Sequence, residues 1–324
     1  MSSCKLGISF GENSLLYSFP GDHPMNKSRL TLFASSLSTF AQDKSNVTII
    51  EPVAGTEEDL LVFHKKEYIQ HVKEQSKTGE GDLNFYDTPV FKGVYEASLF
   101  PVGSTLSGLH YIMTGEFDHF FNPVGGLHHA YEDEARGFCV FNDSGIAISK
   151  AMNDYHLGRV AYIDIDAHHG DGIYYEFEPD PRVIIGDIHE DGRYLYPGTG
   201  NEAETGKAHG KGTKLNIPLQ PGSTDREFFK AIDRVGEFVR AASPEFIFFQ
   251  CGSDGLAGDP IADLQYSPVA HAYATEQFHR LSHEICQGRI LAMGGGGYNP
   301  MNVSAAWMEV VKELSSTCYR ETKS

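Results

Sequence analysis

The chain has 324 residues, 40% of them hydrophobic, which is enough to bury a sizeable core. Its 26 basic residues stand against 44 acidic ones, a net charge of −18, which argues against direct nucleic-acid binding and mildly favours cationic substrates. No run approaches the roughly 18 apolar residues of a membrane span, and the N-terminal segment lacks the features of a signal peptide. The five cysteines are odd in number and scattered, which predicts reduced thiols. We therefore expect a cytoplasmic protein without a membrane partner.

Helix and strand patterns alternate in the first half of the chain. Thr56 can cap a helix whose first residues, 57–59, are acids that suit the positive end of a helix, and this pattern continues to Gln75. The helical pattern over 91–114 contains Pro101, which must kink or divide it. The other elements expected here are a helix through Gln42, a strand over 47–51, a surface loop over 77–88, a loop over 123–143 and a helix over 144–155.

The second half of the chain contains continuous apolar strands separated by helices. The run from Val160 to Ile165 is typical of a parallel strand that is buried on both faces. The alternation predicts an α/β fold with a doubly wound parallel sheet, and no repeat or linker divides the chain, so we expect residues 1–324 to form a single catalytic domain. The remaining elements expected are a helical turn over 173–177, strands over 182–188, 215–217, 246–251 and 289–293, a long loop over 192–212, and helices over 225–241, 269–286 and 303–314.

Ionisable side chains crowd together where the central strand ends: Asp164, Asp166, His168, His169 and Asp171. Unpaired carboxylates are too costly to bury without a function, and ligands of open α/β sheets bind at the carboxyl ends of strands. The pair formed by Asp166 and His168 offers one oxygen and one nitrogen donor to a metal ion. The alternative interpretation is a set of helix caps and solvated loop charges.

Three further loops bring polar groups to the same kind of position. Asp254 follows the strand over 246–251 and could complete a metal site of two aspartates and one histidine, although an aspartate between glycines is also an ordinary turn residue. The adjacent His128 and His129 suggest acid–base chemistry, because histidine titrates near neutrality. Tyr298 follows four glycines, which permit backbone conformations closed to other residues.

Six blocks occur in a specific order along the chain: GGLHHA, EARGFCVFND, YIDIDAHHGDG, YPGTG, CGSDGLAGD and GGGGY. From His23 to the last helix, they resemble the signature blocks of the zinc-dependent histone deacetylase family, in its class I and bacterial acetoin-utilisation-type branches. The resemblance implies the arginase/deacetylase fold, with one open, mostly parallel sheet of about eight strands and helices on both faces. It also implies a hydrolase that removes an acetyl or other short acyl group from the ε-amine of lysine in proteins or peptides, and that binds hydroxamate inhibitors.

The resemblance also assigns roles to individual residues of the reaction centre. The ligands of a Zn²⁺ or Fe²⁺ ion would be Asp166, His168 and Asp254. His129 would act as general base and then as general acid, and His128 would support it electrostatically. The remaining catalytic residues would be the carboxylate partners of these two histidines, Asp171 and Asp164, and the tyrosine that hydrogen-bonds the substrate carbonyl, Tyr298.

Outside the reaction centre, the resemblance implies three further groups of residues. The substrate would contact two aromatic residues that wall a narrow tunnel, a glycine and a rim aspartate: Phe138, Tyr196, Gly137 and Asp87. An inner cavity would involve Arg29 and Cys139. The family's monovalent-cation site, for K⁺, would fall on Asp164, Asp166, His168 and Asp187.

Some positions depart from the family pattern. Asp187 stands where a serine is usual, and Tyr196 replaces the commoner phenylalanine. Ile261 stands where the polyamine-selective deacetylases of animals carry a glutamate, which weakens the case for an acetylpolyamine substrate. Acetylated small amines nevertheless remain the alternative substrate class to acetyl-lysine.

Two other functions fit less well. A binuclear ureohydrolase of the same fold would need aspartates where Gly170 and Leu256 stand. A binding module without activity would be expected to lose metal ligands or the tyrosine, and none is missing.

Overall fold

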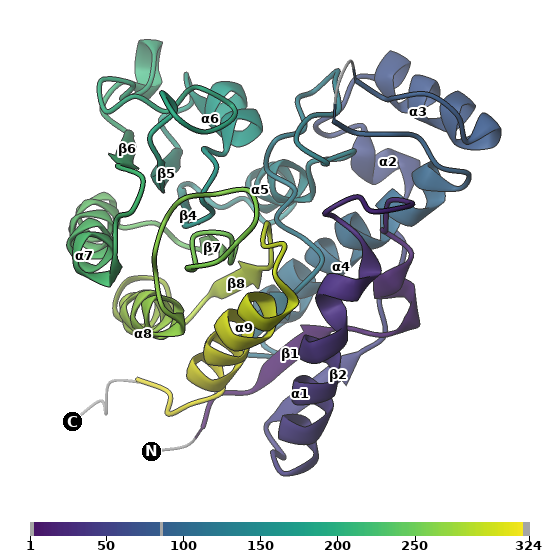
Figure 1. Ribbon diagram of the computed structural model, residues 1–324. Helices are drawn as coiled ribbons and strands as arrows, with labels where there is room; N and C mark the ends of the chain where they lie inside the picture. The colour runs from purple at the N-terminus through teal and green to yellow at the C-terminus, as the bar shows by residue number, and fades with distance from the viewer. Residues whose placement is uncertain (1–2, 85–86, 320–324) are drawn as a thin grey trace.

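The core of the protein is one parallel sheet. The computed structural model describes residues 3–84 and 87–319, and its eight-stranded sheet has the order β2-β1-β3-β8-β7-β4-β5-β6, with every neighbouring pair parallel (Figure 1). This confirms the expected fold class. The strands are β1 (Leu6–Ser9), β2 (Val47–Ile50), β3 (His119–Asn122), β4 (Val160–Asp164), β5 (Val183–Glu190), β6 (Lys214–Leu219), β7 (Ile247–Gln250) and β8 (Ile290–Met293).

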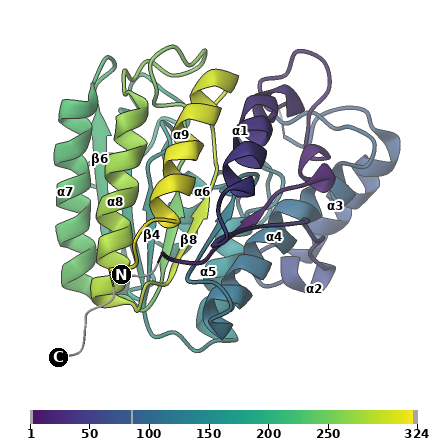
Figure 2. The ribbon, with the colours of Figure 1, turned by 90° about the horizontal axis from the view of Figure 1, so that it is seen from below.

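Helices cover both faces of the sheet, and each face has its own hydrophobic core. Figure 2 shows the helices of one face in a row, and they pack against one another in that order: α7 (Asp225–Ala242), α8 (Pro268–Ile285), α9 (Pro300–Leu314) and α1 (Thr31–Gln42). The other core contains residues from α2 (Glu57–Leu60), α3 (Lys66–Thr78), α4 (Val94–Thr114), α5 (Asp143–Asn153) and α6 (Asp171–Phe177).

Strand β4 shows why the central strands are apolar throughout. Successive side chains of a strand point to opposite faces; thus Ala161 and Ile163 enter one core while Val160 and Tyr162 enter the other. All four are completely buried. A strand covered by helices on both sides has no solvated face on which polar residues could alternate.

The structure differs from the sequence-based expectation in three local features. Strands β1 and β3 had not been expected from the sequence. The helix expected from Glu57 to Gln75 is divided into α2 and α3, since the chain turns to bury Phe63 and His64, whose Nε2 accepts a hydrogen bond from the Asn142 amide at 2.9 Å. Pro101 lies inside α4 without dividing it.

The expectation of five reduced thiols was wrong for two of them. Cys4 and Cys318 form a disulfide across a sequence separation of 314 residues, while Cys139, Cys251 and Cys286 are free and buried. The pairing could not be read from the sequence, because it depends on the two ends of the described chain lying side by side, as Figures 1 and 2 show.

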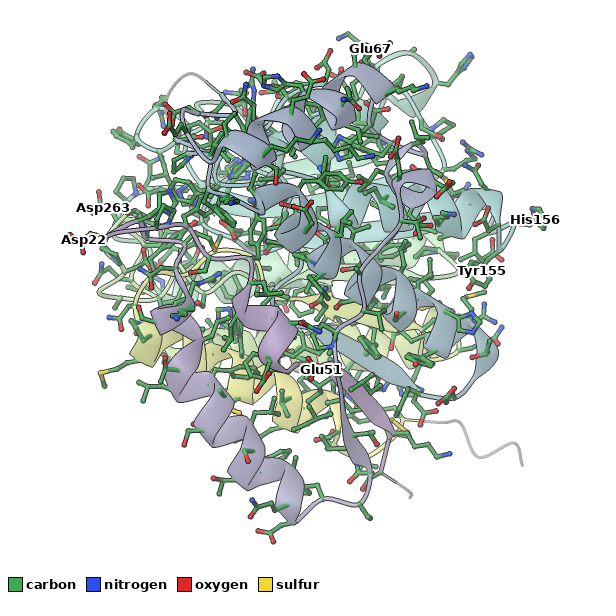
Figure 3. The ribbon with its side chains drawn as sticks, turned by 90° about the vertical axis from the view of Figure 1, so that its right-hand side faces the viewer. Asp22, Glu51, Glu67, Tyr155, His156 and Asp263 are labelled. Carbon is green, nitrogen blue, oxygen red and sulfur yellow. A yellow bond between two sulfur atoms is a disulfide. The ribbon has the colours of Figure 1, made fainter. Side chains whose placement is uncertain are left out.

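Many charged side chains lie on the surface of the molecule. Figure 3 shows Asp22, Glu67 and Asp263 at the margin of the view, and these three and Glu51 are exposed. Within residues 3–84 and 87–319, no helix combines the length and apolarity needed to cross a bilayer.

Candidate active site

Four neighbouring strands of the sheet carry the polar loops singled out in the sequence. Strands β3, β8, β7 and β4 are adjacent and parallel, so their carboxyl ends meet at one edge of the sheet. His128 and His129 follow β3, Tyr298 follows β8, Asp254 follows β7, and the central acidic motif follows β4. This edge is where open α/β sheets bind their ligands. The fold therefore brings together loops that are far apart along the chain.

Asp166, His168 and Asp254 form a compact set of metal-ligand atoms. One oxygen or nitrogen from each lies within 4.8 Å of the others. Nδ1 of His168 is 3.1 Å from Oδ1 of Asp166 and 3.0 Å from Oδ2 of Asp254. The two carboxylates are buried and His168 is 6% exposed. Two oxygen donors and one nitrogen donor leave a coordination position open, as catalytic sites require.

The charge balance of this set fits a bound cation. Burial, and then the negative charge of Asp166, raise the pKa of Asp254 to about 7. Burial opposes ionisation of Asp166 as well, but the charge of His128 and the contacts with His168 hold the pKa of Asp166 well below its usual range. Without a cation, the Asp254 carboxylate beside ionised Asp166 is therefore only partly ionised near neutral pH. A divalent cation would balance both charges, and the donor set suits zinc or iron.

The carboxylates of Asp166 and Asp254 accept hydrogen bonds from donors that the sequence analysis missed. Oδ2 of Asp166 accepts hydrogen bonds from the Gln250 side chain at 2.8 Å and from the Gly296 amide at 2.7 Å. Oδ1 of Asp254 accepts one from the Ala167 amide at 2.8 Å. A Cβ at Gly296 would overlap Oδ2 of Asp254. The glycines before Tyr298 thus turn the chain and also allow the backbone at Gly296 to lie close to the carboxylates.

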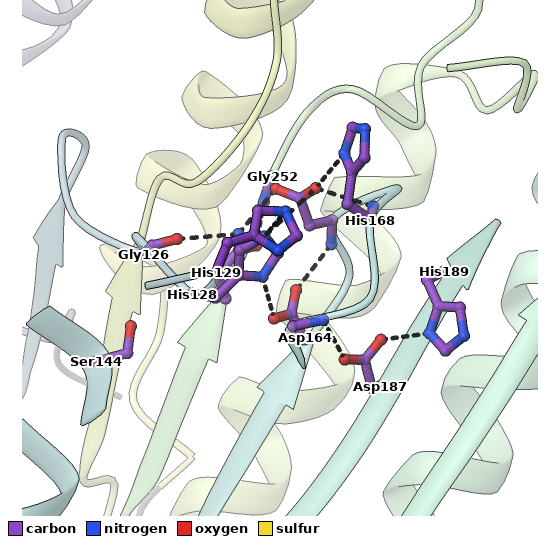
Figure 4. A network of polar contacts seen from close by, with 12 residues as sticks. Gly126, His128, His129, Ser144, Asp164, His168, Asp187, His189 and Gly252 are labelled. Atoms are coloured by element: carbon purple, nitrogen blue, oxygen red, sulfur yellow. Dashed lines mark hydrogen bonds and ion pairs between the residues drawn. The ribbon is translucent and has the colours of Figure 1, made fainter. Parts of the chain in front are cut away.

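The two adjacent histidines are oriented by different carboxylates, and Figure 4 shows the His128 ring against Asp164. His128 donates from Nδ1 to Asp164 at 2.7 Å, and His129 donates from Nδ1 to Asp171 at 2.6 Å. Burial alone would lower the pKa of His128, but the charges of Asp164 and Asp166 outweigh it and raise this pKa to about 10. Burial, and then the charge of His128, lower the pKa of His129. The pair therefore combines a protonated ring with a neutral one.

Tyr298 lies between an aromatic side chain and a buried guanidinium group. Its ring meets the Phe138 ring edge-on at 5.8 Å, and Cζ of Arg29 lies 5.7 Å from its centroid. Arg29 also donates to the carbonyls of Gly295 and Gly297 at 2.8 and 2.7 Å. Arg29, expected in an inner cavity, thus fixes the glycine loop that carries the tyrosine.

A pocket of about 270 Å³ is lined by two of the predicted catalytic residues, His129 and Tyr298, and by all four predicted substrate-binding residues. Exposure falls from 41% at Tyr196 to 6% at His168 and 4% at His129, so the pocket leads from the surface inward to these two histidines. The Tyr196 ring meets the His129 ring at 5.2 Å. The pocket is lined by Asp87, His129, Gly137, Phe138, His168, Leu195, Tyr196, Ile261 and Tyr298.

The loop on the Phe138 side of the pocket is tightly constrained. Gly137 and Phe138 have φ of 52° and 67°, a backbone region that favours glycine. A Cβ at Gly137 would overlap the His129 ring, while its amide donates to Asp87 at 3.2 Å. Tyr17, which the sequence analysis did not single out, donates to the Phe138 carbonyl at 2.6 Å. Cys139 lines a separate cavity of about 10 Å³ behind the pocket.

Asp187 belongs to a polar pair next to the reaction centre. It accepts from Nδ1 of His189 at 2.6 Å and from the Gly170 amide at 3.0 Å, and Nε2 of His189 donates to the Gly200 carbonyl at 2.9 Å. Burial would lower the pKa of His189, but the charge of Asp187 outweighs it and raises this pKa. Figure 4 shows the pair beside Asp164. Asp187 is therefore already paired with a buried imidazole.

Comparisons with known proteins agree with this geometry. A model of the histone deacetylase domain matches residues 23–314. The chain is 38% identical over 308 residues to the acetoin utilization protein AcuC of Bacillus subtilis (strain 168), covering 92% of this chain and 79% of the relative. It is 33% identical over 267 residues to histone deacetylase 8 of Danio rerio, covering 80% and 69%. The crystal structure of the HDA15 HD domain superposes with a TM-score of 0.87 at 28% identity, covering 97% and 90%. This chain therefore belongs to the histone deacetylase family and is a hydrolase of that family.

Proposed function

We propose that the enzyme is a metal-dependent deacetylase that hydrolyses ε-acetyl-lysine in proteins or peptides. The observation that carries this proposal is the pocket whose side chains become less exposed from Tyr196 toward His129 and His168. Asp166, His168 and Asp254 would hold Zn²⁺, or Fe²⁺ with the same donors. A cation bound there would supply a Lewis acid for the amide carbonyl and lower the pKa of a bound water.

Side chains in and beside the pocket would carry out proton transfer and stabilise the developing charge. His129, kept neutral at neutral pH, would take a proton from the attacking water and later give it to the leaving amine. Asp171 holds Nδ1 of His129 and so directs Nε2 toward the reacting atoms, while protonated His128 would favour the negative charge that develops. Tyr298 would donate a hydrogen bond to the carbonyl oxygen as it gains charge.

The chemistry of the pocket wall favours an acyl-lysine side chain over a polyamine. Phe138, Tyr196, Leu195 and Ile261 present apolar surface that suits a slim alkyl chain. Asp87 is the one carboxylate among the described lining residues, whereas a polyamine carries further ammonium groups that would need acidic partners. Asp87 is half-buried and would accept from the backbone amides of a peptide.

Acetylated small amines are the second candidate, since the net charge of −18 favours cationic substrates. We further propose that hydroxamates bind the metal centre, that K⁺ binds near Asp164, Asp166, His168 and Asp187, and that the enzyme acts in the cytoplasm.

A substrate panel with one matched variant tests the proposal. The metal-loaded enzyme is assayed on an acetyl-lysine peptide, N-acetylputrescine and N-acetylspermidine. We expect the highest kcat/KM on the peptide. Ile261→Glu adds a carboxylate to the wall and should move the preference toward the acetylpolyamines. A higher kcat/KM of the unaltered enzyme on an acetylpolyamine would overturn the lysine assignment, and no turnover of any amide would overturn the deacetylase mechanism.

A further inference from the structure

A second group of metal-binding side chains lies outside the active site. Cys4, His119, His279 and His283 each present one ligand atom, and these atoms lie within 4.8 Å of one another. Cys4, His119 and His279 are completely buried, and His283 is partly buried. The catalytic mechanism uses none of them.

The topology places this cluster at the opposite edge of the sheet from the active site. Cys4 lies two residues before β1, and His119 is the first residue of the neighbouring strand β3. His279 and His283 lie one turn apart near the end of α8. The cluster is thus at the amino ends of the strands, whereas the active site is at their carboxyl ends.

The distances within the cluster match those around a tetrahedral ion. Nε2 of His119 and Nε2 of His279 are 3.0 Å apart. Sγ of Cys4 is 3.7 Å from Nε2 of His279 and 3.5 Å from Nε2 of His283. Zinc bonds of standard length in tetrahedral geometry would separate two nitrogens by about 3.4 Å, and a nitrogen from a sulfur by about 3.6 Å. These three distances are thus within about 0.4 Å of those around one ion, and the remaining pairs of ligand atoms lie within 4.8 Å of one another.

The surroundings of the cluster also suit a metal centre. Nδ1 of His279 lies 3.6 Å from the Glu313 carboxylate, the kind of outer partner that orients a ligating imidazole. Tyr319 covers the ring of His279 at a centroid distance of 5.0 Å. Burial, and then the charges of His279 and His283, hold the pKa of His119 well below its usual range, so this ring is neutral.

We propose that Cys4, His119, His279 and His283 form a second metal site, for a borderline divalent cation such as Zn²⁺, which is open when Cys4 is a thiolate and closed when Cys4 pairs with Cys318. The same sulfur cannot be a disulfide sulfur and a metal thiolate at once, and the structure shows it in the disulfide. Cysteine and histidine are the ligands of structural zinc sites, which have four protein ligands.

Conversion of the Cys4–Cys318 disulfide to the metal-bound Cys4 thiolate takes two balanced steps, a reduction and then a substitution. A phosphine reductant breaks the Cys4–Cys318 bond: phosphorus supplies two electrons and becomes a phosphine oxide with the oxygen of water, and the two protons of that water go to the two thiols. Zn²⁺ then replaces the proton of the Cys4 thiol, which is released to solvent.

Binding of Co²⁺ tests the second site without interference from metal bound at the catalytic site. Co²⁺ bound by a thiolate gives a sulfur-to-cobalt charge-transfer band, whereas the ligands of the catalytic site carry no sulfur. We expect the band in phosphine-reduced protein after the phosphine is removed, and its absence in the disulfide form. Zinc content should rise from about one to about two per chain on reduction. A reduced protein with neither the band nor the added zinc would overturn the proposal.

Variants separate the proposed ligands from their neighbours. Cys318→Ser keeps the Cys4 thiol free, so it should show the band without reduction. Cys4→Ser and His283→Gln should lose the band and the added zinc, and His71→Gln, at an exposed site on α3, should keep both. Loss of the band in Cys318→Ser would instead assign the metal to the neighbouring set of Cys4, Asp118 and Cys318 and overturn the ligand assignment.

The deacetylase assay serves as the folding control for these variants. His283 is partly buried and its replacement is the mildest of the ligand changes. Retained turnover with a lost cobalt band places the effect at the second site, independent of whether the preferred substrate is a peptide or a small amine. An unchanged band in a folded, active His283→Gln enzyme would exclude this histidine as a ligand and overturn the four-ligand site.

Discussion

The Nε2 atoms of His128 and His129 lie 3.1 Å apart, although the Nδ1 atoms of the two rings are held by different carboxylates. Each charge state therefore affects the other: protonated His128 lowers the pKa of His129, which Asp171 partly restores. Adjacent residues in one loop thus acquire opposite protonation states at neutral pH. This asymmetry would allow His129 to act as the base that we propose.

Replacing each histidine in turn should separate their roles. His129→Ala should lower kcat by at least the 10²–10⁴-fold that general-base catalysis typically contributes, since the same group also protonates the amine. His128→Ala should lose less near neutrality. Because removal of the His128 charge raises the pKa of His129, and the base is inactive when protonated, the acid limb of the kcat/KM profile should move to higher pH. Equal small losses and unmoved profiles would contradict both roles.

Tyr298→Phe removes one hydroxyl and preserves the ring that packs against Phe138. A lost donor to a developing oxyanion typically lowers turnover about 10²–10³-fold, while metal content and folding should be unchanged. We expect the variant to bind hydroxamates and acetyl-lysine peptides with near-normal affinity, measured by calorimetry, and to hydrolyse the peptides slowly. Turnover close to that of the unaltered enzyme would show that the hydroxyl does not stabilise the transition state.

Metal content should depend on the ligands and on the glycine beside them. Asp254→Ala and His168→Ala each remove one of three protein ligands and should lose most of the catalytic metal, measured by elemental analysis of the disulfide form. Gly296→Ala should also lose metal, because its Cβ would overlap the Asp254 carboxylate. Gly236→Ala is the control: it lies in α7 with open space around it and should instead stabilise the fold by about 0.5–1 kcal/mol. Full metal occupancy in Gly296→Ala would show that a Cβ at this position does not displace the Asp254 carboxylate.

His64 should make the fold sensitive to acid. Burial lowers its pKa from 6.5 to about 3, so between these values the unfolded chain binds a proton that the folded protein does not. The contribution of neutral His64 to the free energy of unfolding is therefore fully present above pH 6.5 and is lost as the pH falls toward 3. At pH 5 the free energy of unfolding is lower by about 2 kcal/mol on this account. His64→Gln keeps an acceptor for the Asn142 amide but cannot titrate.

Denaturant unfolding at pH 7 and pH 5 measures this effect. The difference in unfolding free energy between the two pH values should be smaller in His64→Gln than in the unaltered protein. His71→Gln, which changes an exposed histidine, should leave the difference as it was. An identical pH dependence in all three proteins would mean that His64 does not remain neutral in the folded state.

Much of the fold could be predicted from local patterns. The apolar run of β4 indicated a strand buried on both faces, and the polar residues at its end indicated a site, because such groups are not buried without partners. Asp166 and His168 are close in sequence, so their pairing as ligands needed no knowledge of the fold. The ordered blocks around His129, Asp254 and Tyr298 then predicted the family, which the comparisons confirm.

Other features depended on the tertiary structure. Gln250, which holds Asp166, sits in an apolar strand and carries no sequence signal of its role. Arg29 reaches the Gly297 carbonyl across 268 residues. Such contacts depend on which strands are neighbours, and the periodicity of one segment says nothing about strand order.

The sequence by itself determined the class of fold, the positions of six of the eight strands, and the chemistry of the loop after β4. The tertiary structure decided which distant residues meet: the hydrogen bonds that orient the carboxylates, the Cys4–Cys318 pair, and the gathering of His119 and His279 around Cys4. Local propensity acts over a few residues, whereas these meetings follow from strand order and helix packing, which are properties of the whole folded chain.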